Sequence, residues 1–304
     1  AIMGTLVSGQ ATIGTAQLAF NYGMSAWWFT LGSGIGCLIL ALGYAAPLRH
    51  SGCSTLLQIV SREYGPRAET WGSVLSSIGI FISVVAQILS ATALLITIFP
   101  VSHLAAALIS ILLMAVYVMF GGGWGAGMGG VVKLILLYVS AIAGGVLVYG
   151  LANGFGGVLE TVEHLLVNSP LGALSGVESQ QAVHERFTSL IARGASKDIG
   201  SGLSLVLGVL STQTYAQAIW SGKSDRAAKK GALLSACLIP PIGIACILIG
   251  LYMRGHCITA DEVAALQAVG QSVPEGLIQI ESTSQVFPVF VARFMPALFG
   301  GVVL

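Results

Sequence analysis

Glycine and small polar residues alternate in the apolar stretch that begins the chain. Gly4, Gly9 and Gly14 recur every five residues. Among and after them stand hydroxyl and amide side chains, namely Thr5, Ser8, Gln10, Thr12, Thr15 and Gln17. Such neutral oxygens, together with backbone carbonyls, can replace the water around an alkali cation. The chemistry that these residues could perform is therefore reversible binding of a small cation and of a polar solute.

Two structures fit this stretch. Glycine weakens helix continuity, and an interrupted helix at membrane depth is tolerated only where its freed backbone groups face protein or a water-filled cavity. The half-helix ends and bare carbonyls then become ligands for a cation and a polar substrate. Alternatively the helix is unbroken, and its glycines allow close packing on neighbouring helices. The residues of this stretch alone leave both structures open.

Two further groups of polar residues stand inside apolar stretches. The first group comprises Thr212, Gln213, Tyr215 and Gln217. It predicts either the lining of a solute path or hydrogen bonds between helices. Gln87 lies alone in the middle of another apolar run, where one interhelical hydrogen bond would satisfy it. Because these stretches carry essentially no Asp, Glu or His at depth to relay protons, sodium coupling fits them better than proton coupling.

The composition is that of a membrane protein. Of 304 residues, 55% are hydrophobic and only 8% are charged, whereas soluble domains carry roughly 25% charged residues. The net charge of +1 and the dispersed Lys and Arg residues exclude a basic face for nucleic acid. The five cysteines form no Cys-x-x-Cys pair and the histidines stand alone, so we expect no metal site and no enzyme active site. Both chain ends fall inside apolar stretches, which predicts a fragment cut at both ends.

Eight apolar windows approach or exceed the roughly 20 residues that cross a bilayer. They cover residues 2–22, 24–46, 70–98, 101–120, 129–152, 199–221, 231–253 and 287–304. We expect a pliant cytoplasmic turn at the Gly-rich run 121–130, between the fourth and fifth windows. Pro240 and Pro241 predict a kink inside the seventh window. The chain is thus expected to form one transmembrane domain over residues 1–304.

Two helices are predicted outside the spans. An amphipathic segment over 56–64 begins after Ser54 or Thr55 and stops at Gly65-Pro66, which is typical of a helix lying in the membrane interface. Another covers 261–267, with Thr259 as its N-cap. The loops after the second, fourth and sixth windows hold eight Lys and Arg residues against five on the other side. This bias predicts that the even-numbered windows end in the cytoplasm.

The most specific pattern covers Ser211 to Gly231. It places Gln217 four residues after Gln213, then a small residue before Lys223, then Lys230-Gly231. This run resembles the sixth core helix and following loop of the sodium:solute symporter family, which carries sugars, proline, pantothenate and similar solutes. Similarity to that family extends to stretches 22–65 (with Arg49 just after the second window), 116–122 and 287–300. The similarity extends along nearly the whole chain except about 155–195.

The resemblance implies an all-α membrane fold of the LeuT type. That fold has two five-helix repeats of inverted topology, with helices 1 and 6 broken at the binding site, and the eight windows would be its core helices 1 to 8. The resemblance places sodium-binding backbone carbonyls near Gly4 and Val7, and a further pair of hydroxyls beyond Leu304. Together with Ser8 and Gln87, which their residue types single out, the expected solute contacts are Gln10, Ala11, Thr30, Thr212, Gln213 and Tyr215.

Two positions depart from the family's pattern. Gly129-Gly130 stand where the family usually has Thr-Asp, whose carboxylate is thought to help sodium leave. Ala218 replaces the Arg that commonly follows the Gln of helix 6. Both departures concern the route by which the ion exits, and they bear on tight coupling more than on the fold.

The expected function is sodium-coupled symport of a small polar organic solute by alternating access. Its partners are sodium, the solute and the lipid bilayer, and we expect a monomeric functional unit in the plasma membrane of a prokaryotic cell. One alternative is a solute-sensing membrane input domain of a histidine kinase, in which binding is kept and turnover lost. Another is a purely structural membrane scaffold, in which the polar residues only join helices.

Overall fold

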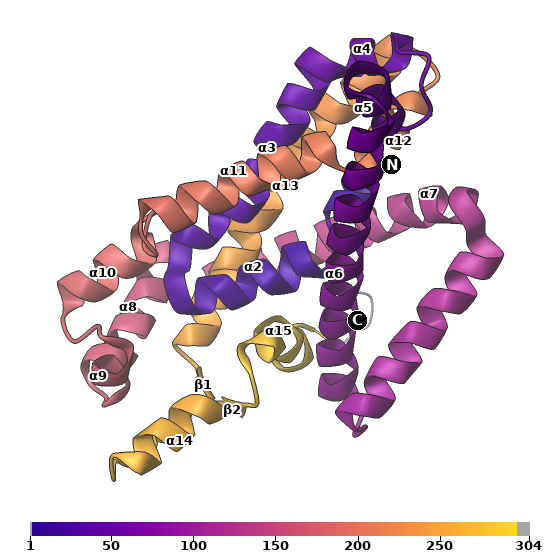
Figure 1. Ribbon diagram of the computed structural model, residues 1–304. Coiled ribbons are helices and arrows are strands. Elements are labelled where there is room, and N and C mark those ends of the chain that lie inside the picture. Colours follow the sequence, from indigo (N-terminus) through magenta and orange to yellow (C-terminus); the bar gives the residue numbers. More distant parts are fainter. Residues whose placement is uncertain (1, 297–304) are drawn as a thin grey trace.

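The computed structural model describes residues 2–296, with all their side chains except those of residues 3, 5, 10 and 121–129. Helices dominate the fold (Figure 1). The first span consists of two helices, α1 (Ile2–Leu6) and α2 (Gly9–Tyr22), and a 3-10 turn at Gly23–Ala26 follows it. The second span comprises α3 (Trp27–Ile39), a π-helical turn (Leu40–Tyr44) and α4 (Ala45–His50). Then come α5 (Leu56–Tyr64), α6 (Pro66–Ile98) and α7 (His103–Leu151).

The second half of the chain adds shorter helices around one long one. These are α8 (Phe155–Val167), α9 (Leu171–Ser175), α10 (Gln180–Thr188), α11 (Ala195–Ser211), α12 (Gln213–Trp220) and the long α13 (Asp225–Arg254). Strand β1 (Cys257–Thr259), α14 (Ala260–Ala268), strand β2 (Ile278–Ile280), a 3-10 turn (Thr283–Gln285) and α15 (Val286–Phe294) complete it. The two short strands pair in parallel and form a two-stranded sheet, and the other regular elements of the described residues are helices.

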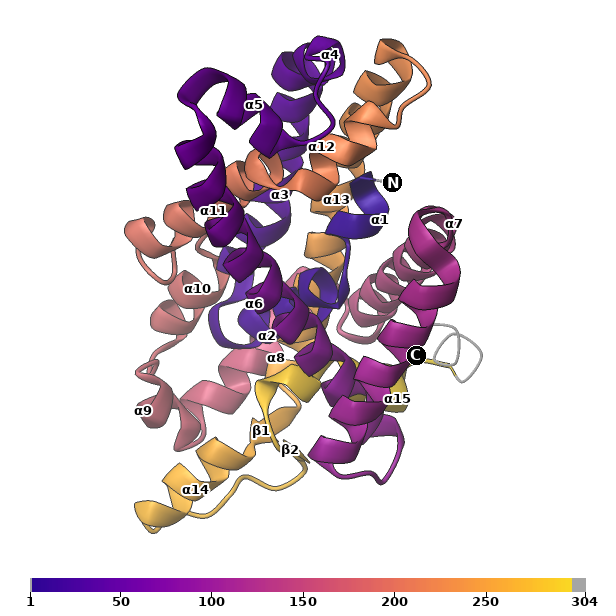
Figure 2. The same ribbon diagram turned by 45° about the vertical axis from the view of Figure 1, so that its right-hand side comes forward.

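Helix α13 is the centre of the bundle. It packs against α2, α3 and α7, and its second half is almost entirely buried. Glycines make this packing close, because a Cβ at Gly243 would overlap the hydroxyl of Thr30 and one at Gly250 would overlap the backbone of Ala16. Figure 2 shows the short α1 among α7, α12 and α13, and all three of those helices contact it. The start of the first span is therefore enclosed by helices from the middle and the second half of the chain.

The predicted spans are found with differences. Within the part of the chain that the structure describes, five helical segments are long and apolar enough to cross a membrane: Ala11–His50, Pro66–Ile98, His103–Phe120, Gly130–Leu151 and Asp225–Arg254. The first of them joins two predicted windows, because helical turns continue through Gly23 although the chain reverses there (Figure 1). The sixth window is divided between α11 and α12, so neither half reaches the length of a span. Most of the eighth lies outside the described residues.

The predicted turn at residues 121–130 is wrong in its local structure. The backbone stays helical throughout α7, and the change of direction is a sharp bend within that helix (Figure 1). Its two halves still run in different directions, as two spans must. The two helices predicted outside the spans are confirmed as α5 and α14, each begun by a threonine capping box, at Thr55 and at Thr259. The backbone of α13 remains helical across Pro240 and Pro241, whose kink stays a prediction.

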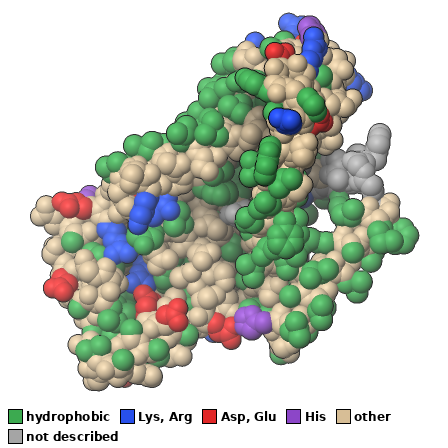
Figure 3. All heavy atoms as spheres, in the orientation of Figure 1, with side chains coloured by type: hydrophobic (Ala, Val, Ile, Leu, Met, Phe, Trp, Pro, Cys, Tyr) green, Lys and Arg blue, Asp and Glu red, His purple; other side chains and the backbone are tan. Residues whose placement is uncertain are grey.

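Charged side chains gather at two ends of the molecule. Figure 3 shows one group over α4 and α5 and another around α9, α10 and α14, with hydrophobic and uncharged surface between them. Helix α6 exposes large apolar side chains along that middle zone, Phe81 at 69% and Leu89 at 64% among them. Exposed apolar surface of this extent belongs in lipid. Over the described residues the fold is thus a helical multi-pass membrane bundle, and which end faces the cytoplasm stays a prediction.

Candidate functional site

The helix of the first span is interrupted at Val7 and Ser8. Helix α1 ends at Leu6 and α2 begins at Gly9, while Ser8 has an extended backbone (φ −116°, ψ 176°). The carbonyl of Ser8 accepts the backbone N–H groups of Ala11 and Thr12 at 2.9 and 3.2 Å and so starts α2. The first of the two structures considered for this stretch is therefore the one observed. An interruption of this kind leaves the last carbonyls of α1 without their helical donors.

Gln87 of α6 meets this interruption. Its Nε2 donates a hydrogen bond of 3.0 Å to the Oγ of Ser8, which is the interhelical bond expected for this half-buried amide. Gly9 lies against the same helix, since a Cβ there would be 3.3 Å from the Cβ of Ser90. Ser8 and Gln87, which the sequence placed in one site, are thus brought together.

Gly4 packs directly on the backbone of Gly130 in α7. A Cβ at Gly4 would lie 2.7 Å from the carbonyl oxygen of Gly130 and 2.9 Å from its Cα. The reverse contact is looser, because a Cβ at Gly130 would lie 3.6 Å from the Cα of Gly4. The position at which the family usually carries a carboxylate therefore adjoins the carbonyls expected to bind sodium. Whether those carbonyls bind the ion stays a prediction.

A second interruption lies at Thr212, between α11 and α12. Its backbone is extended (φ −83°, ψ 127°), and its carbonyl accepts the N–H of Tyr215 at 3.2 Å. The side chain of Gln213 reaches away to α5, where its Oε1 accepts the N–H of Leu56 at 2.8 Å and its Nε2 donates to the carbonyl of Ser54 at 3.4 Å. Gln213 thus joins the second interruption to the start of α5.

The other expected contacts occupy different surroundings. The hydroxyl of Thr30 donates to the carbonyl of Trp27 at 3.3 Å and faces Gly243, so in this conformation it packs α3 on α13. Ala11 is buried, and its carbonyl accepts the hydroxyl of Thr15 at 2.6 Å. Gln10 belongs to the first turn of α2, and its side chain lies outside the described part. The roles of all these residues as solute contacts stay predictions.

A cavity of about 490 Å³ lies between α2 and α6, beginning at Ile13 of α2. It is lined by α2 at Gly14 and Gln17, by α6 at Ser90 and Thr92, and by the segment before α15. The hydroxyl of Thr92 is buried and has no hydrogen-bond partner among the described residues. Sequence reasoning missed Ser90 and Thr92. The signal for Ser90 was its spacing, because it stands three positions after Gln87 and shares its helix face. Thr92, five positions after Gln87, lies off that face, so its spacing gave no signal.

Arg49, at the end of α4, fastens the second span to the sixth and seventh. Its Nε donates to Oδ1 of Asp225 at 2.6 Å, and its Nη1 donates to the carbonyls of Ile219, Trp220 and Gly222 at the end of α12. A cation at a helix C-terminus satisfies carbonyls that the helix itself leaves free. The indole N–H of Trp220 in turn donates to the carbonyl of Leu48.

We expect Arg49→Ala to lower the melting temperature of the purified protein more than Asp225→Asn does. The Ala variant loses one ion pair and removes a donor from three carbonyls, of which that of Ile219 keeps the backbone N–H of Gly222, a cost of about 2 kcal/mol or more. The Asn variant keeps the arginine on those carbonyls. Thermal unfolding followed by tryptophan fluorescence measures both shifts, and equal shifts would contradict the role of the carbonyls.

The described residues hold no group of three or more His, Cys, Asp or Glu side chains that could bind a metal ion. The comparison with family models matches residues 1–304 to the sodium:solute symporter family. A curated relative is the uncharacterized symporter YwcA of Bacillus subtilis (strain 168), which is 27% identical over 175 residues, covering 57% of this chain and 34% of that protein. The aligned part is thus about a third of the relative's length. Since the family match covers the whole chain, the chain belongs to the sodium:solute symporter family.

Proposed function

We propose that the chain forms the transport domain of a sodium-coupled symporter that moves a small polar organic solute across the plasma membrane by alternating access. The observation that carries the proposal is the pair of interrupted helices, at Val7–Ser8 and at Thr212, in a member of this family. Helix α1 contacts α12, so the segments that flank the two interruptions lie together. Interrupted helices at membrane depth provide backbone oxygens and partial charges for ions and solutes.

Sodium is the coupling ion in this proposal. The carbonyls near Gly4 and Val7 are its ligands, and the hydroxyls and amides around the interruptions contact the solute. The LeuT-type arrangement of inverted repeats, with a monomer as the functional unit, belongs to the same proposal. The cavity beside α2 and α6 would be the outer part of the solute path, because Ser90 lines it and also adjoins Gly9.

The sensor alternative gains no support from the comparisons. The family is one of transporters, and the relative from Bacillus subtilis carries the name of a symporter. An all-structural scaffold would need no interruption of its helices. The comparisons and the interrupted helices therefore favour the transport proposal over both alternatives.

The decisive experiment measures solute uptake into proteoliposomes that contain the full protein. A panel of neutral polyols, zwitterions and weak acids is tested under an imposed sodium gradient, an imposed proton gradient, or neither. We expect one class of solute to accumulate only with the sodium gradient. Equal uptake without sodium would overturn the coupling, and absence of uptake for every solute, with binding retained, would favour the sensor.

The bond between Ser8 and Gln87 separates solute binding from simple helix joining. Ser8→Ala leaves the Gln87 amide without its partner, which costs about 1–3 kcal/mol, so uptake is expected to fall about tenfold or more. The double variant Ser8→Ala/Gln87→Leu removes the unpaired amide as well. If both residues also contact solute, the double variant stays as low as the single one. Recovery of uptake in the double variant would show that Ser8 and Gln87 only join two helices and do not contact the solute.

A further inference from the structure

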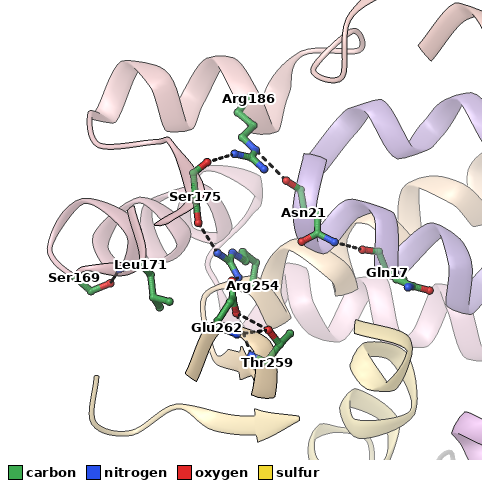
Figure 4. A network of polar contacts seen from close by, with 9 residues as sticks. All are labelled: Gln17, Asn21, Ser169, Leu171, Ser175, Arg186, Arg254, Thr259 and Glu262. Carbon is green, nitrogen blue, oxygen red and sulfur yellow. Dashed lines mark hydrogen bonds and ion pairs between the residues drawn. The ribbon is translucent and has the colours of Figure 1, made fainter. Parts of the chain in front are cut away.

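A polar cavity of about 230 Å³ lies at the end of the molecule opposite α5. Five elements meet around it: the ends of α2, α9 and α13, together with α10 and α14. Figure 4 shows the two arginines that line it, Arg186 of α10 and Arg254 of α13, on either side of Ser175. Arg186 donates to the carbonyl of Ser175 at 2.6 Å, and Arg254 donates to its hydroxyl at 3.2 Å. Two guanidinium groups thus share one small residue.

Arg254 has a carboxylate partner. Its side chain is 4% exposed, and its Nη1 pairs with Oε1 of Glu262 at 2.6 Å. Its guanidinium also lies 4.8 Å from the ring centroid of Phe20. The other oxygen of Glu262 accepts the N–H and the hydroxyl of Thr259 in the capping box of α14. Glu262, the one acidic residue that lines the cavity, therefore has both carboxylate oxygens engaged by Arg254 and Thr259.

Arg186 has no such partner. Its Nε donates to the carbonyl of Asn21 at 3.0 Å, so Arg186 is bound to carbonyls at the ends of α2 and α9. The hydrogen bonds of the described residues leave its Nη2 for a further acceptor. Burial is the main cause that lowers the pKa of Arg186, and the charge of Arg254 adds to it. The carbonyls at the ends of α2 and α9 carry partial negative charge and offset part of the charge of Arg186.

We propose that this cavity binds a small monovalent anion, a halide or the carboxylate of a small organic acid, between Arg186 and Arg254. Two arginines and one glutamate leave a formal charge of +1 in a partly buried polar space. The volume of about 230 Å³ holds such an anion with several waters, since a water takes about 30 Å³. Guanidinium donors suit both ligands, and they suit carboxylates in the paired geometry.

The anion would hold three segments together. Helices α9 and α10 precede the sixth span, and the cavity joins them to the outer end of α2, which is the second part of the interrupted first span. Asn21 continues the contact along α2, because its Nδ2 donates to the carbonyl of Gln17 at 3.4 Å (Figure 4). Gln17 in turn donates to Thr283 at 2.9 Å and lines the larger cavity. Occupancy at the arginines is thus linked to the position of the outer half of the first span.

Thermal unfolding of the full protein in detergent tests the proposal without any transport assay, so its failure leaves the proposed function untouched. Sodium and ionic strength are held constant while methanesulfonate is replaced by chloride in one arm and by acetate in another. We expect a saturable rise in melting temperature in at least one arm, and the arm that saturates at lower concentration identifies halide or carboxylate. An identical, non-saturating response to all three anions would overturn the site.

Three variants make the test specific. Arg186→Gln should abolish the saturable rise, whereas Lys197→Gln, which removes an exposed cation on the same side, should keep it. Glu262→Gln removes the competing negative charge, so it should tighten the apparent anion affinity about tenfold or more. A purely structural cluster predicts no tightening. If Arg186→Gln does not fold, Glu262→Gln decides: tighter binding supports the site, and unchanged or weaker binding overturns it.

Discussion

A Gly4→Val protein is expected to lose sodium-dependent uptake almost completely while still reaching the membrane. A side chain at this position would start 2.7 Å from the carbonyl oxygen of Gly130, a distance that only backbone movement can relieve. Overpacking of this kind costs about 1–3 kcal/mol, and α1 can relieve it only by moving away from α7. Because the proposed sodium ligands are carbonyls of this segment, uptake should fall about tenfold to a hundredfold. Uptake under a sodium gradient, normalised to protein in the membrane, measures the loss.

The matched control is Gly130→Ala, on the other side of the same contact. A Cβ there meets the Cα of Gly4 at 3.6 Å, an ordinary van der Waals distance, and alanine also favours the helix of α7. Uptake should stay within about twofold of the parent, since a cost of a few tenths of a kcal/mol is all that this contact implies. If Gly4→Val and Gly130→Ala reduced uptake equally, any change at the Gly4–Gly130 contact would lower uptake, and displacement of α1 would not be the cause.

Gly130→Asp is expected to lower the sodium concentration that gives half-maximal uptake. Its carboxylate would extend beside Gly4, within reach of the carbonyls proposed to hold the ion. Two unit charges about 5 Å apart attract by about 3 kcal/mol at an effective dielectric constant of 20. The cost of burying the carboxylate reduces this gain, so we expect about a tenfold change. The sodium dependence of initial uptake rates measures it.

Gly130→Asn separates charge from size in that experiment. It has the shape of the aspartate without its charge, so its half-maximal sodium concentration should match that of the parent. An equal shift in the Asn and Asp variants would show that the effect comes from packing. No shift in either variant would place the ion away from Gly4.

Local patterns in the sequence predicted local structure. The sequence predicts a helix start after Ser54 or Thr55 and an N-cap at Thr259, and the structure begins α5 after Thr55 and α14 after Thr259, each with a capping box. Glycines among hydroxyls in an apolar stretch allowed an interrupted first helix, and the interruption is found at Val7 and Ser8. The glycine run in α7 misled because glycine lowers helix propensity by about 1 kcal/mol per residue, which surrounding helical structure can override.

Long-range pairings could not be predicted in the same way. The residue type of Gln87 required a partner, but only the fold makes that partner Ser8, 79 positions away. The side chain of Gln213 bonds the start of α5, 157 positions away in the chain, and its role at the solute stays a prediction. Arg186 belongs to α10 and Arg254 to the end of α13, so no sequence spacing joins them. Side-chain partners of this kind depend on how whole helices pack.

The parallel pairing of β1 with β2 determines where the chain can be altered. Strand β1 leaves α13 directly and β2 leads into α15, and three residue pairs join them, from Cys257 with Ile278 to Thr259 with Ile280. The pairing of the two strands therefore connects α13 to α15 directly, and residues 260–277 form an excursion between β1 and β2. Residues 267–272 of that excursion are exposed, and exposed polar loops accept inserted sequence most readily. A reporter protein or an antibody epitope placed there would leave the helices of the bundle joined.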